Sequence, residues 1–567
     1  MRSLLALAGL VLLSGCNSPL AAPIERASPE DATPTRGGVL RLASIADVRG
    51  LDPAVTADAA GAMAMEGIFA GLVDFDANGH IVTDLAEHFE MTPDGREYTF
   101  TLRQGLRFHD GDEVTADDVR RSIERALHPD TPSAFASFYD RITGFKEYTE
   151  RKSEHLEGVR VLGRYVVSIR LSSPDATFLP AFAISMLRPV CKSAGERYDD
   201  TWTPCGAGPF KIAPNGWDHG RSLTLVRHDG WYKPGQPYLD GVVFTYGMNS
   251  TTQRFKLEDG DLDVTQDLSQ TDTLRFFADT RWLPYGFKEG ARNIYGESMN
   301  VEMAPFDNIE VRRAVACAID REHMRLLRAA NMSVQTRALP PVLAPAEPGF
   351  PGQHFDLAEA LQHMKNAGYP FDPATGKGGW PHPIIYVAAK AGLLEFTSQL
   401  LQQDLARIGI RIELKIVNWA TYLAMSQRRN TVALAPAGWQ SDFPDAADFF
   451  EPIFSTASIA NENSNNSAFY SNGKLDALLD VARKETDQAA RARMYREADR
   501  VVCDDAPWAF EYVVQRLVVH QPYVRGFHDH FVWDLYARDT WIDRAKRELT
   551  SRSGVFGHLG SVLGSNR

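Results

Sequence analysis

The hydrophobic pattern of the first half of the chain predicts strands and a helix. Apolar and polar side chains alternate over residues 97–102, as in a strand with one buried face. Thr115 is then a good helix N-cap, with Asp118 three residues later. The apolar positions of the first strand are Tyr98, Phe100 and Leu102, those of the helix are Val119, Ile123 and Leu127, and a further strand is expected at Val242, Phe244 and Tyr246.

The clearest unit of the pattern lies at residues 394–416. Gly409 ends a helix there, and apolar residues then alternate from Ile410 to Ile416 as in a strand. The helix face is formed by Leu394, Thr397, Leu401, Leu405 and Ile408. Further helices are expected over Val311–Arg325, Leu475–Arg483 and Ala489–Val502, and an unstructured tail from about Lys546. A helix that leads into a strand is the unit of an α/β lobe, so we expect an α/β protein.

The N-terminus has the pattern of an export signal. A positive charge at Arg2 precedes an apolar run from Leu4 to Leu13, which is shorter than the roughly 20 residues that span a bilayer. The run ends in Leu-Ser-Gly-Cys, which resembles a bacterial lipobox, so we expect cleavage after residue 15 and a lipidated Cys16. The Pro-, Ala- and Ser-rich stretch that follows, to residue 36, predicts a flexible tether.

Length and charge restrict the architecture and the partners. A chain of 567 residues exceeds one ordinary core, so two or three lobes are expected. The net charge of −13 argues against nucleic acid or an anionic lipid surface as the partner. No later segment has 18 uninterrupted apolar residues, so we expect Cys16 to be the only membrane attachment. We also expect a monomer. Without zinc-type spacing, we expect no structural metal and no cofactor.

Four cysteines remain beside Cys16, and export permits disulfides. Cys191 and Cys205 bracket a short polar loop and are the better candidate pair. Cys317 and Cys503 lie in helical patterns, and the sequence leaves two interpretations open: a second disulfide, or two buried thiols.

Several ordered motifs resemble one family, the extracytoplasmic solute-binding proteins for peptides, nickel and related ligands (family 5). They run from about Gly37 to Asp543, nearly all of the expected mature chain. The motifs are Asp84-Leu85-Ala86, Asp94-Gly95-Arg96-Glu97-Tyr98-Thr99-Phe100, Phe108-His109-Asp110-Gly111, Gly206-Ala207-Gly208-Pro209-Phe210, Pro305-Phe306-Asp307-Asn308, Val311-Arg312-Arg313-Ala314-Val315, Gly438-Trp439-Gln440-Ser441-Asp442-Phe443-Pro444 and Ala506-Pro507-Trp508.

The resemblance implies a periplasmic-binding-protein type II clamshell, with two lobes and an extra domain inserted in the first lobe. Ligand would bind between the lobes, which close on it and present the closed form to an ABC transporter permease. The expected division is 1–15 signal peptide, 16–36 lipidated Cys and tether, 37–67 lobe I, 68–184 extra domain, 185–290 lobe I, 291–512 lobe II, 513–545 lobe I return and 546–567 tail.

The resemblance also implies ligand-binding residues. Asp442 matches the aspartate that pairs with the α-ammonium of a peptide, Trp439 offers a flat face to a ligand side chain, and Gly438 and Gln440 match a strand that pairs with an extended peptide. Phe135 stands where relatives often have a ligand-contacting tyrosine. A turn-capping role for Asp442 and plain core packing for Trp439 are the alternatives.

The chain departs from the peptide-binding pattern at two positions that matter. At Phe135, the hydroxyl of the relatives' tyrosine is missing. Some oligopeptide binders have an arginine for the peptide carboxylate three residues before the tryptophan, where this chain has Pro436. Other partners for a ligand carboxylate are Arg428, Arg429, Arg292 and His354, and the sequence selects none of them. The same fold with a nickel chelate, an oligosaccharide or an opine as ligand, or a role as a sensory co-receptor, therefore stays open beside peptide import.

Other motifs favour ordinary structural roles. Phe108–Gly111 is interpreted as a hairpin turn, His528-Asp529-His530 as a solvated loop, and Gly376–Gly379 as a turn without phosphate-loop spacing. A secreted hydrolase is the remaining alternative class. The sequence has no HExxH, no GxSxG and no Cys–His pairing in a catalytic context, so we do not expect an enzyme.

Overall fold

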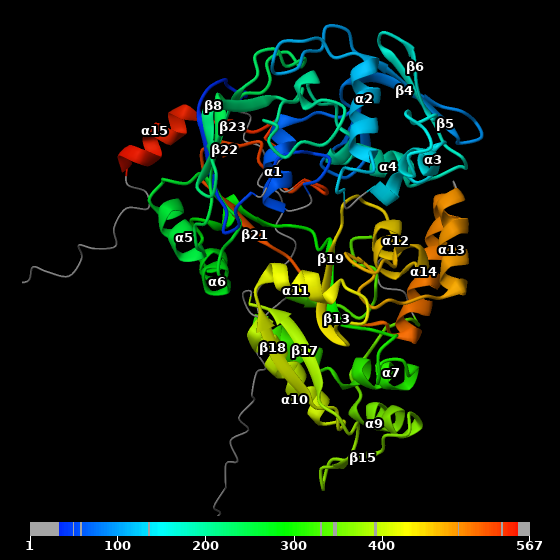
Figure 1. Ribbon diagram of the computed structural model, residues 1–567. Helices are drawn as coiled ribbons and strands as arrows, with labels where there is room; N and C mark the ends of the chain where they lie inside the picture. Colours follow the sequence, from blue (N-terminus) through cyan, green and yellow to red (C-terminus); the bar gives the residue numbers. More distant parts are fainter. Residues whose placement is uncertain are drawn as a thin grey trace, which may run out of the picture.

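The computed structural model describes residues 33–48, 50–56, 59–133, 136–328, 332–343, 349–390, 394–485, 487–533 and 537–553. The predicted signal peptide, Cys16, Phe135 and the last residues of the predicted tail lie outside these ranges. Figure 1 shows two lobes, with the lower one coloured mainly green to orange. Within the described ranges, no helix combines the length and the apolar character needed to cross a bilayer.

The first lobe is built on a seven-stranded sheet whose strands come from distant parts of the chain. In spatial order they are β12 (Gly286–Lys288), β21 (Leu517–His520), β11 (Val264–Thr265), β1 (Val39–Ala43), β10 (Gly241–Thr245), β9 (Ser222–Arg227) and β8 (Phe210–Asp218). The β1 and β10 strands are parallel, with Leu40 beside Val242. Helix α1 (Ala59–Ile68) packs on β8, and the core lies between them. The other helices of this lobe are α5 (Ser250–Glu258), α6 (Gln270–Ala278) and α15 (Arg544–Ser553), and a short ribbon joins β22 (Val524–Arg525) to β23 (Trp541–Ile542).

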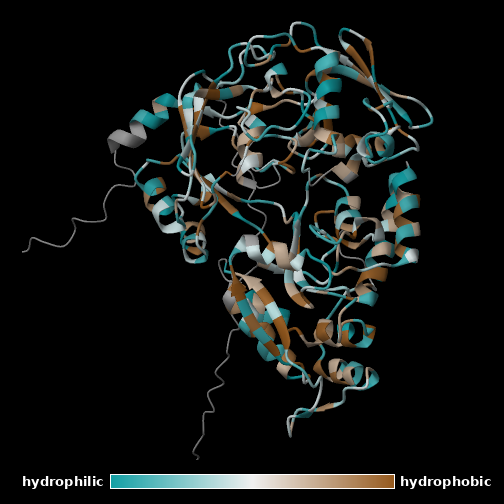
Figure 2. Cartoon of the chain, in the orientation of Figure 1, coloured by the Kyte–Doolittle hydropathy of each residue, from teal (hydrophilic) through white to brown (hydrophobic). Residues whose placement is uncertain are grey.

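The second lobe is built on a six-stranded sheet. Its strands are β14 (Met332–Val334), β20 (Trp508–Val514), β13 (Asn293–Met299), β19 (Leu434–Gln440), β17 (Ile384–Ala389) and β18 (Ile412–Val417). One face is covered by α12 (Ala447–Phe454), α13 (Gly473–Lys484) and α14 (Gln488–Asp505). The other is covered by α7 (Ile309–Ala318), α9 (Leu357–Asn366) and α10 (Leu394–Ala406), with α8 (Arg321–Arg328) beside them. Helix α11 (Trp419–Ser426) lies on the same face as α12, where it packs on Val387 and Ala389 of β17. Figure 2 shows brown segments along β17 and β18, whose apolar residues pack on the core with α10.

A third, four-stranded sheet packs against the first lobe, and we call it with its helices the insert unit. In spatial order, its strands are β4 (Ala86–Met91), β5 (Glu97–Leu102), β7 (Val166–Arg170) and β6 (Val159–Gly163). Its helices are α2 (Ala116–Leu127), α3 (Phe145–Thr149) and α4 (Phe178–Ala183). A two-stranded ribbon of β2 (Val73–Phe75) and β3 (Ile81–Thr83) precedes them in the chain. The predicted alternation at residues 97–102 is confirmed, because its apolar positions are the buried ones. The predicted cap is also confirmed: Thr115 and Asp118 form a capping box at the start of α2.

Buried charges join the insert unit to the first lobe. Arg538 donates to Asp84 at 2.8 Å, and its guanidinium lies 3.0 Å from both Glu66 and Asp74. Arg188 makes a second ion pair with Glu66, at 2.8 Å. All five side chains are at most 2 % exposed, so each charge depends on the others for its stabilisation.

Two predicted segments are wrong. Val311–Arg325 is not one helix: α7 ends at Ala318 and α8 begins at Arg321, because the side chain of Asp320 accepts from the backbone of Glu322 and starts a new helix. The tail from Lys546 is not unstructured as far as Ser553, because α15 covers it. The side chain of Asp543 accepts from the backbone of Lys546, and Arg547 lies over the Tyr523 ring at 5.2 Å.

The remaining predicted elements agree with the structure. The helix and strand at 394–416 are α10 and β18, and Gly409 between them has a φ of +80°. The helices predicted at 475–483 and 489–502 lie within α13 and α14. The glycine-rich segment at 376–379 is part of a small hairpin of β15 (Phe371–Asp372) and β16 (Lys377–Gly378).

Candidate functional site

Strand β19 pairs with β13 along one edge, and its opposite edge is largely without a strand partner among the described residues. The β13 strand pairs with all seven residues of β19, whereas on the other edge β17 pairs only at Leu434. From Ala437 to Gln440, no further strand of the described chain lies on that edge. Gly438 and Gln440 are also exposed. This segment can therefore pair its backbone with an added extended chain.

Gly438 is required by the aromatic ring across from it. Its register partner on β13 is Tyr295, whose ring stacks on Tyr512 at 5.2 Å. A side chain at position 438 would collide with the Tyr295 ring. The glycine thus leaves room for the Tyr295 ring, which crosses from β13 over β19 and stacks on Tyr512.

Trp439 points mainly toward the helices. It is half-buried, lies opposite Ile294, and packs on the core formed with α12, α13 and α14. Its indole Nε1 is buried and has no hydrogen-bond partner among the described residues. The side chain therefore belongs in part to the core of the second lobe.

Asp442 follows β19 in a loop and forms a pair with a second carboxylate. The backbone N–H of Asp442 donates to Oδ2 of Asp448 at 2.6 Å, and that of Phe443 donates to the same atom at 3.4 Å. Burial raises the pKa of Asp442 to about 7. Burial and the nearby charge of Asp442 hold the pKa of Asp448 well above its ordinary value. At neutral pH, Asp442 is therefore close to half ionised, and the neutral form of Asp448 is favoured relative to that of an ordinary aspartate.

The loop that carries Asp442 contacts the insert unit. Phe443 is buried in the core of that unit, with its ring edge-on to Phe138 at 5.5 Å. The Tyr139 hydroxyl donates to the Ala181 carbonyl at 2.7 Å, and burial together with the charge of Asp442 raises the pKa of this phenol. Asp442 thus lies at the boundary between the second lobe and the insert unit.

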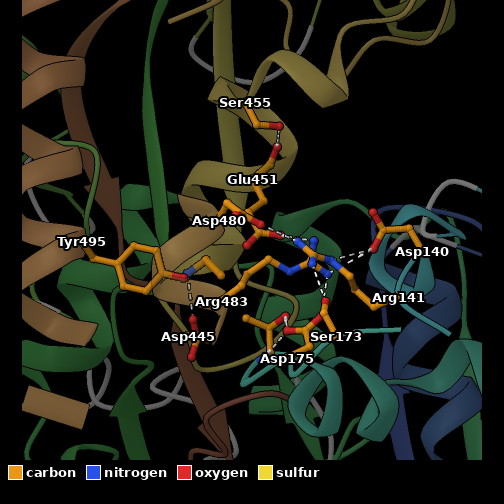
Figure 3. Close-up of polar contacts among 12 residues, drawn as sticks. Asp140, Arg141, Ser173, Asp175, Asp445, Glu451, Ser455, Asp480, Arg483 and Tyr495 are labelled. Atoms are coloured by element: carbon orange, nitrogen blue, oxygen red, sulfur yellow. Dashed lines mark hydrogen bonds and ion pairs between the residues drawn. The ribbon is translucent and has the colours of Figure 1, made fainter. Parts of the chain in front are cut away.

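A network of charges connects the same two parts at α13 (Figure 3). Arg483 donates to Asp175 at 2.6 Å and to Asp140 at 3.2 Å, both in the insert unit, and lies 3.5 Å from Glu451 on α12. The N–H of Ala176 donates to the Arg483 carbonyl at 2.7 Å. Burial raises the pKa of Glu451 to about 8, and the charge of Arg483 opposes this rise.

A second arginine, supplied by the insert unit, also forms an ion pair across this contact. Arg141 of the insert unit donates to Asp480 of α13 at 2.9 Å and to Ser173 at 2.5 Å. The two arginines therefore come from opposite parts, and each finds a carboxylate in the other (Figure 3). We call Arg141, Asp480, Arg483, Asp140 and Asp175 the closing network.

The four candidate partners for a ligand carboxylate are each bound to an acidic side chain of the protein. Arg429 donates to Glu302 at 2.7 Å, and Arg428 lies 3.6 Å from Glu462. Arg292 pairs with Asp529 at 2.6 Å, and His354 with Glu359 at 2.8 Å. The geometry of the described residues therefore singles out none of them as a ligand partner.

The loop at 528–530 is not solvated as predicted. Asp529 binds Arg292, and Arg292 also donates to the His530 carbonyl. His530 is 2 % exposed, and its ring contacts the Phe75 carbonyl at 3.2 Å. Burial lowers the pKa of His530 to about 4, so it is neutral at physiological pH. The charge of Arg292 and the Phe75 carbonyl draw this loop inward.

The cysteines outside the N-terminal segment are all accounted for. A disulfide joins Cys191 to Cys205, with Cα atoms 5.4 Å apart. Cys317 and Cys503 are free and buried, so the interpretation of a second disulfide is wrong. Phe108–Gly111 forms the expected turn, and the flanking residues Arg107 and Glu113 pair through their backbones in an antiparallel β-bridge.

Three residues of this region were not found from the sequence. Asp448 follows Asp442 by six positions, but acidic residues at such spacing are common. Tyr139 and Arg483 belong to segments that meet Asp442 and Asp175 only in the folded chain, and no local pattern marks them. Of the predicted site residues, Gly438, Trp439 and Gln440 lie on β19 and Asp442 lies just beyond it, whereas Phe135 is outside the described residues.

Comparison with known proteins identifies the family of the chain. Residues 80–461 match the family model "Bacterial extracellular solute-binding proteins, family 5 Middle". The chain belongs to this family. Heme-binding protein A of Haemophilus influenzae is 29 % identical over 465 residues, covering 78 % of this chain and 80 % of the relative. Glutathione-binding protein GsiB of Salmonella typhi is 28 % identical over 485 residues, covering 84 % and 89 %.

A solved member of the family has the same fold. The periplasmic binding protein DppA of Helicobacter pylori, in complex with the peptide STSA, superposes with a TM-score of 0.76 at 23 % identity, covering 90 % of this chain and 98 % of that one. The predicted fold class is confirmed: an α/β type II periplasmic-binding-protein clamshell. Family 5 members are solute-binding transport proteins that act outside the cytoplasm with ABC permeases, which confirms the predicted class of function.

Proposed function

We propose that this family 5 protein captures peptides between its lobes and delivers them to an ABC permease, without catalysing a reaction. The observation that carries the proposal is Asp442, a half-buried carboxylate at the end of an open strand edge. The proposal includes a lipid anchor at Cys16, a monomeric state and the domain boundaries predicted from the sequence.

The open edge of β19 supports a peptide as ligand. An extended peptide that pairs with Ala437–Gln440 would bind through its backbone, which gives affinity without selecting side chains. Its N-terminal ammonium would then be placed toward Asp442. A buried ammonium requires a charged, hydrogen-bonding partner, and the ionised Asp442 supplies one.

A second candidate is a solute that has an amino group but no free carboxylate. It is favoured by the pairing of Arg292, Arg428, Arg429 and His354 with acidic side chains of the protein. The relatives show that solutes differ within the family, because their names give heme for one and glutathione for another. A ligand of this kind would use Asp442 but not the full edge of β19.

The test is to identify the ligand and to remove the charge of Asp442. Ligand released from purified protein by gentle denaturation is identified by mass spectrometry, and peptide affinity is measured by calorimetry for wild type and Asp442→Asn. We expect released peptides, and an affinity lowered by about 10²-fold or more in the variant, because one partner of a buried charge pair is lost.

The control is Asp504→Asn, which neutralises an exposed aspartate at the end of α14 and should leave binding unchanged. Release of a non-peptide solute would contradict the peptide as ligand while leaving the family role intact. Equal affinity in wild type and Asp442→Asn would exclude Asp442 as the ammonium partner. Cleavage of added peptides would favour the hydrolase instead.

A further inference from the structure

A cluster of metal-ligand side chains lies on the second lobe, away from the β19 edge. It is formed by α7, by α9 and by the turn that leads into α9, which Figure 1 shows at the lower end of the molecule. Asp356 caps α9 by accepting from the N–H of Glu359 at 3.0 Å, and its own N–H donates to the Cys317 carbonyl at 2.9 Å. These bonds fix the turn and both helices relative to one another.

Three different ligand types meet in this cluster. The Cys317 sulfur, a carboxylate oxygen of Glu359 and a ring nitrogen of His363 all lie within 4.8 Å of one another. Glu359 and His363 are one turn apart on α9, and Cys317 comes from α7. Sulfur, imidazole nitrogen and carboxylate oxygen are the atoms by which proteins bind zinc and similar divalent ions.

An independent feature orients the histidine. Nδ1 of His363 lies 2.8 Å from Oε2 of Glu310, and the same oxygen accepts from the Asn366 amide at 3.0 Å. With its proton on Nδ1, the ring presents the lone pair of Nε2 toward Glu359, whose Oε1 is 3.6 Å away. A carboxylate behind a histidine ligand is the usual arrangement at protein metal sites, where it fixes the ring and raises its basicity.

We propose that Cys317 Sγ, His363 Nε2 and Glu359 bind one divalent ion of the zinc class, with Glu310 as the carboxylate that orients His363. The fourth position is left to water or to His354, which contacts the other oxygen of Glu359 at 2.8 Å. The thiol releases its proton to solvent when the ion binds as thiolate ligand. Because the thiol must lose its proton to become a ligand, affinity for the ion rises with pH.

The site explains why the cluster combines a buried thiol with a histidine between two glutamates. The alternative is that a protonated His363 simply bridges Glu310 and Glu359 as an ion pair. That alternative needs no sulfur and predicts no affinity for a metal ion. The two interpretations therefore differ in a measurable way.

The experiment is a titration of the full chain, stripped with a chelator, with Co²⁺ as a spectroscopic probe for Zn²⁺. We expect one equivalent to bind with a near-ultraviolet thiolate-to-cobalt absorption that Zn²⁺ abolishes. Cys317→Ser should lose the absorption, and His363→Ala should weaken binding strongly. Glu310→Gln should weaken it by about 10- to 100-fold, as expected for a group behind a ligand.

The matched control is Cys503→Ser, which removes the other buried free thiol and should leave the absorption intact. Cys16 is common to all variants and cancels in the comparison. Thermal melting gives a second readout, because Zn²⁺ should raise the Tm of wild type and of Cys503→Ser but not of Cys317→Ser. Absence of the absorption in wild type, or its persistence in Cys317→Ser, would overturn the proposal.

Discussion

The pair of Asp442 and Asp448 makes the candidate site sensitive to pH at the level of single residues. Because the pKa of Asp442 is about 7, its charge changes within the physiological range. The pKa of Asp448 is also raised, and its Oδ2 accepts hydrogen bonds from the N–H groups of the loop instead of binding a cation. The two carboxyl groups thus differ in role although they lie side by side.

The affinity for a peptide with a free N-terminus should pass through a maximum between about pH 7 and pH 8. Below the pKa of Asp442 the carboxyl is neutral, so affinity falls by up to about tenfold per pH unit. Above about pH 8 the peptide amine, with an ordinary pKa of 7.7–8.0, loses its own charge. Calorimetry from pH 5.5 to 9 measures this profile.

An N-acetylated peptide is the control for this profile, because it has no ammonium and should bind weakly at every pH. Asp442→Asn should lose the decrease on the acid side. A free peptide whose affinity is constant from pH 5.5 to 7.5 would show that Asp442 does not pair with its amine.

Residues with a local signature were predictable, and residues brought together by the fold were not. Gly438, Trp439, Gln440 and Asp442 stand within five positions of one another, so one motif indicates them all. Asp175 and Arg483 are far apart in the sequence and become partners only when the insert unit meets α13. The surroundings that raise the pKa of Asp442 are likewise a property of tertiary packing.

At the scale of elements, periodic burial was a reliable guide and the cap at Thr115 was predicted, whereas two aspartate caps were not recognised. The helix α10 and the strand β18 follow their apolar pattern because each buries one face in the sheet core. The break at Asp320 and the helix after Asp543 are both set by an aspartate side chain that caps backbone N–H groups. Such caps act through one hydrogen bond and leave the hydrophobic pattern unchanged.

The disulfide stabilises the glycine-rich turn that follows it. Replacing Cys191 and Cys205 together by Ser should lower the free energy of unfolding by about 3 kcal/mol, because the bond closes a loop with a separation of 14 residues. Urea unfolding measures the change. A reductant should lower wild type to the same value and leave the double variant unaffected, whereas equal stability of the two proteins would show that the bond constrains little.

At the scale of the whole molecule, the closing network holds the insert unit against the second lobe. The side chains of Asp175 and Arg483 are 1 % and 10 % exposed. Both charges therefore lose their hydration when the insert unit contacts the second lobe. Separation of the two parts would return both charges to water. The contact between the two parts therefore depends on the presence of both partners, because loss of one would leave the other charge buried and unpaired.

Arg483→Ala should weaken ligand binding by about 5- to 150-fold, the usual range for coupling between a ligand and a conformational change. In the variant, closure would bury Asp175 without its cation, so the open arrangement gains population. Calorimetry measures the affinity, and small-angle X-ray scattering with and without ligand measures the compaction. Lys474→Ala is the control, since Lys474 is an exposed cation of α13 that pairs with Glu497, outside the closing network.

An unchanged affinity in Arg483→Ala, with compaction equal to that of wild type, would show that the network does not contribute to closure. A fall in the melting temperature of the ligand-free variant alone would instead assign Arg483 a role in stability.

The position of β21 in the first sheet has a consequence for how the molecule is made. β21 lies between β12 and β11, and β12 has no other strand partner in this sheet. A chain delivered across a membrane from its N-terminus exposes β1 and β8–β12 long before residues 517–520 arrive. The second lobe, whose strands all lie between Asn293 and Val514, can complete its sheet first. Until residues 517–520 emerge, the newly exported molecule carries unpaired edges on β11 and β12, where another chain could pair in place of β21.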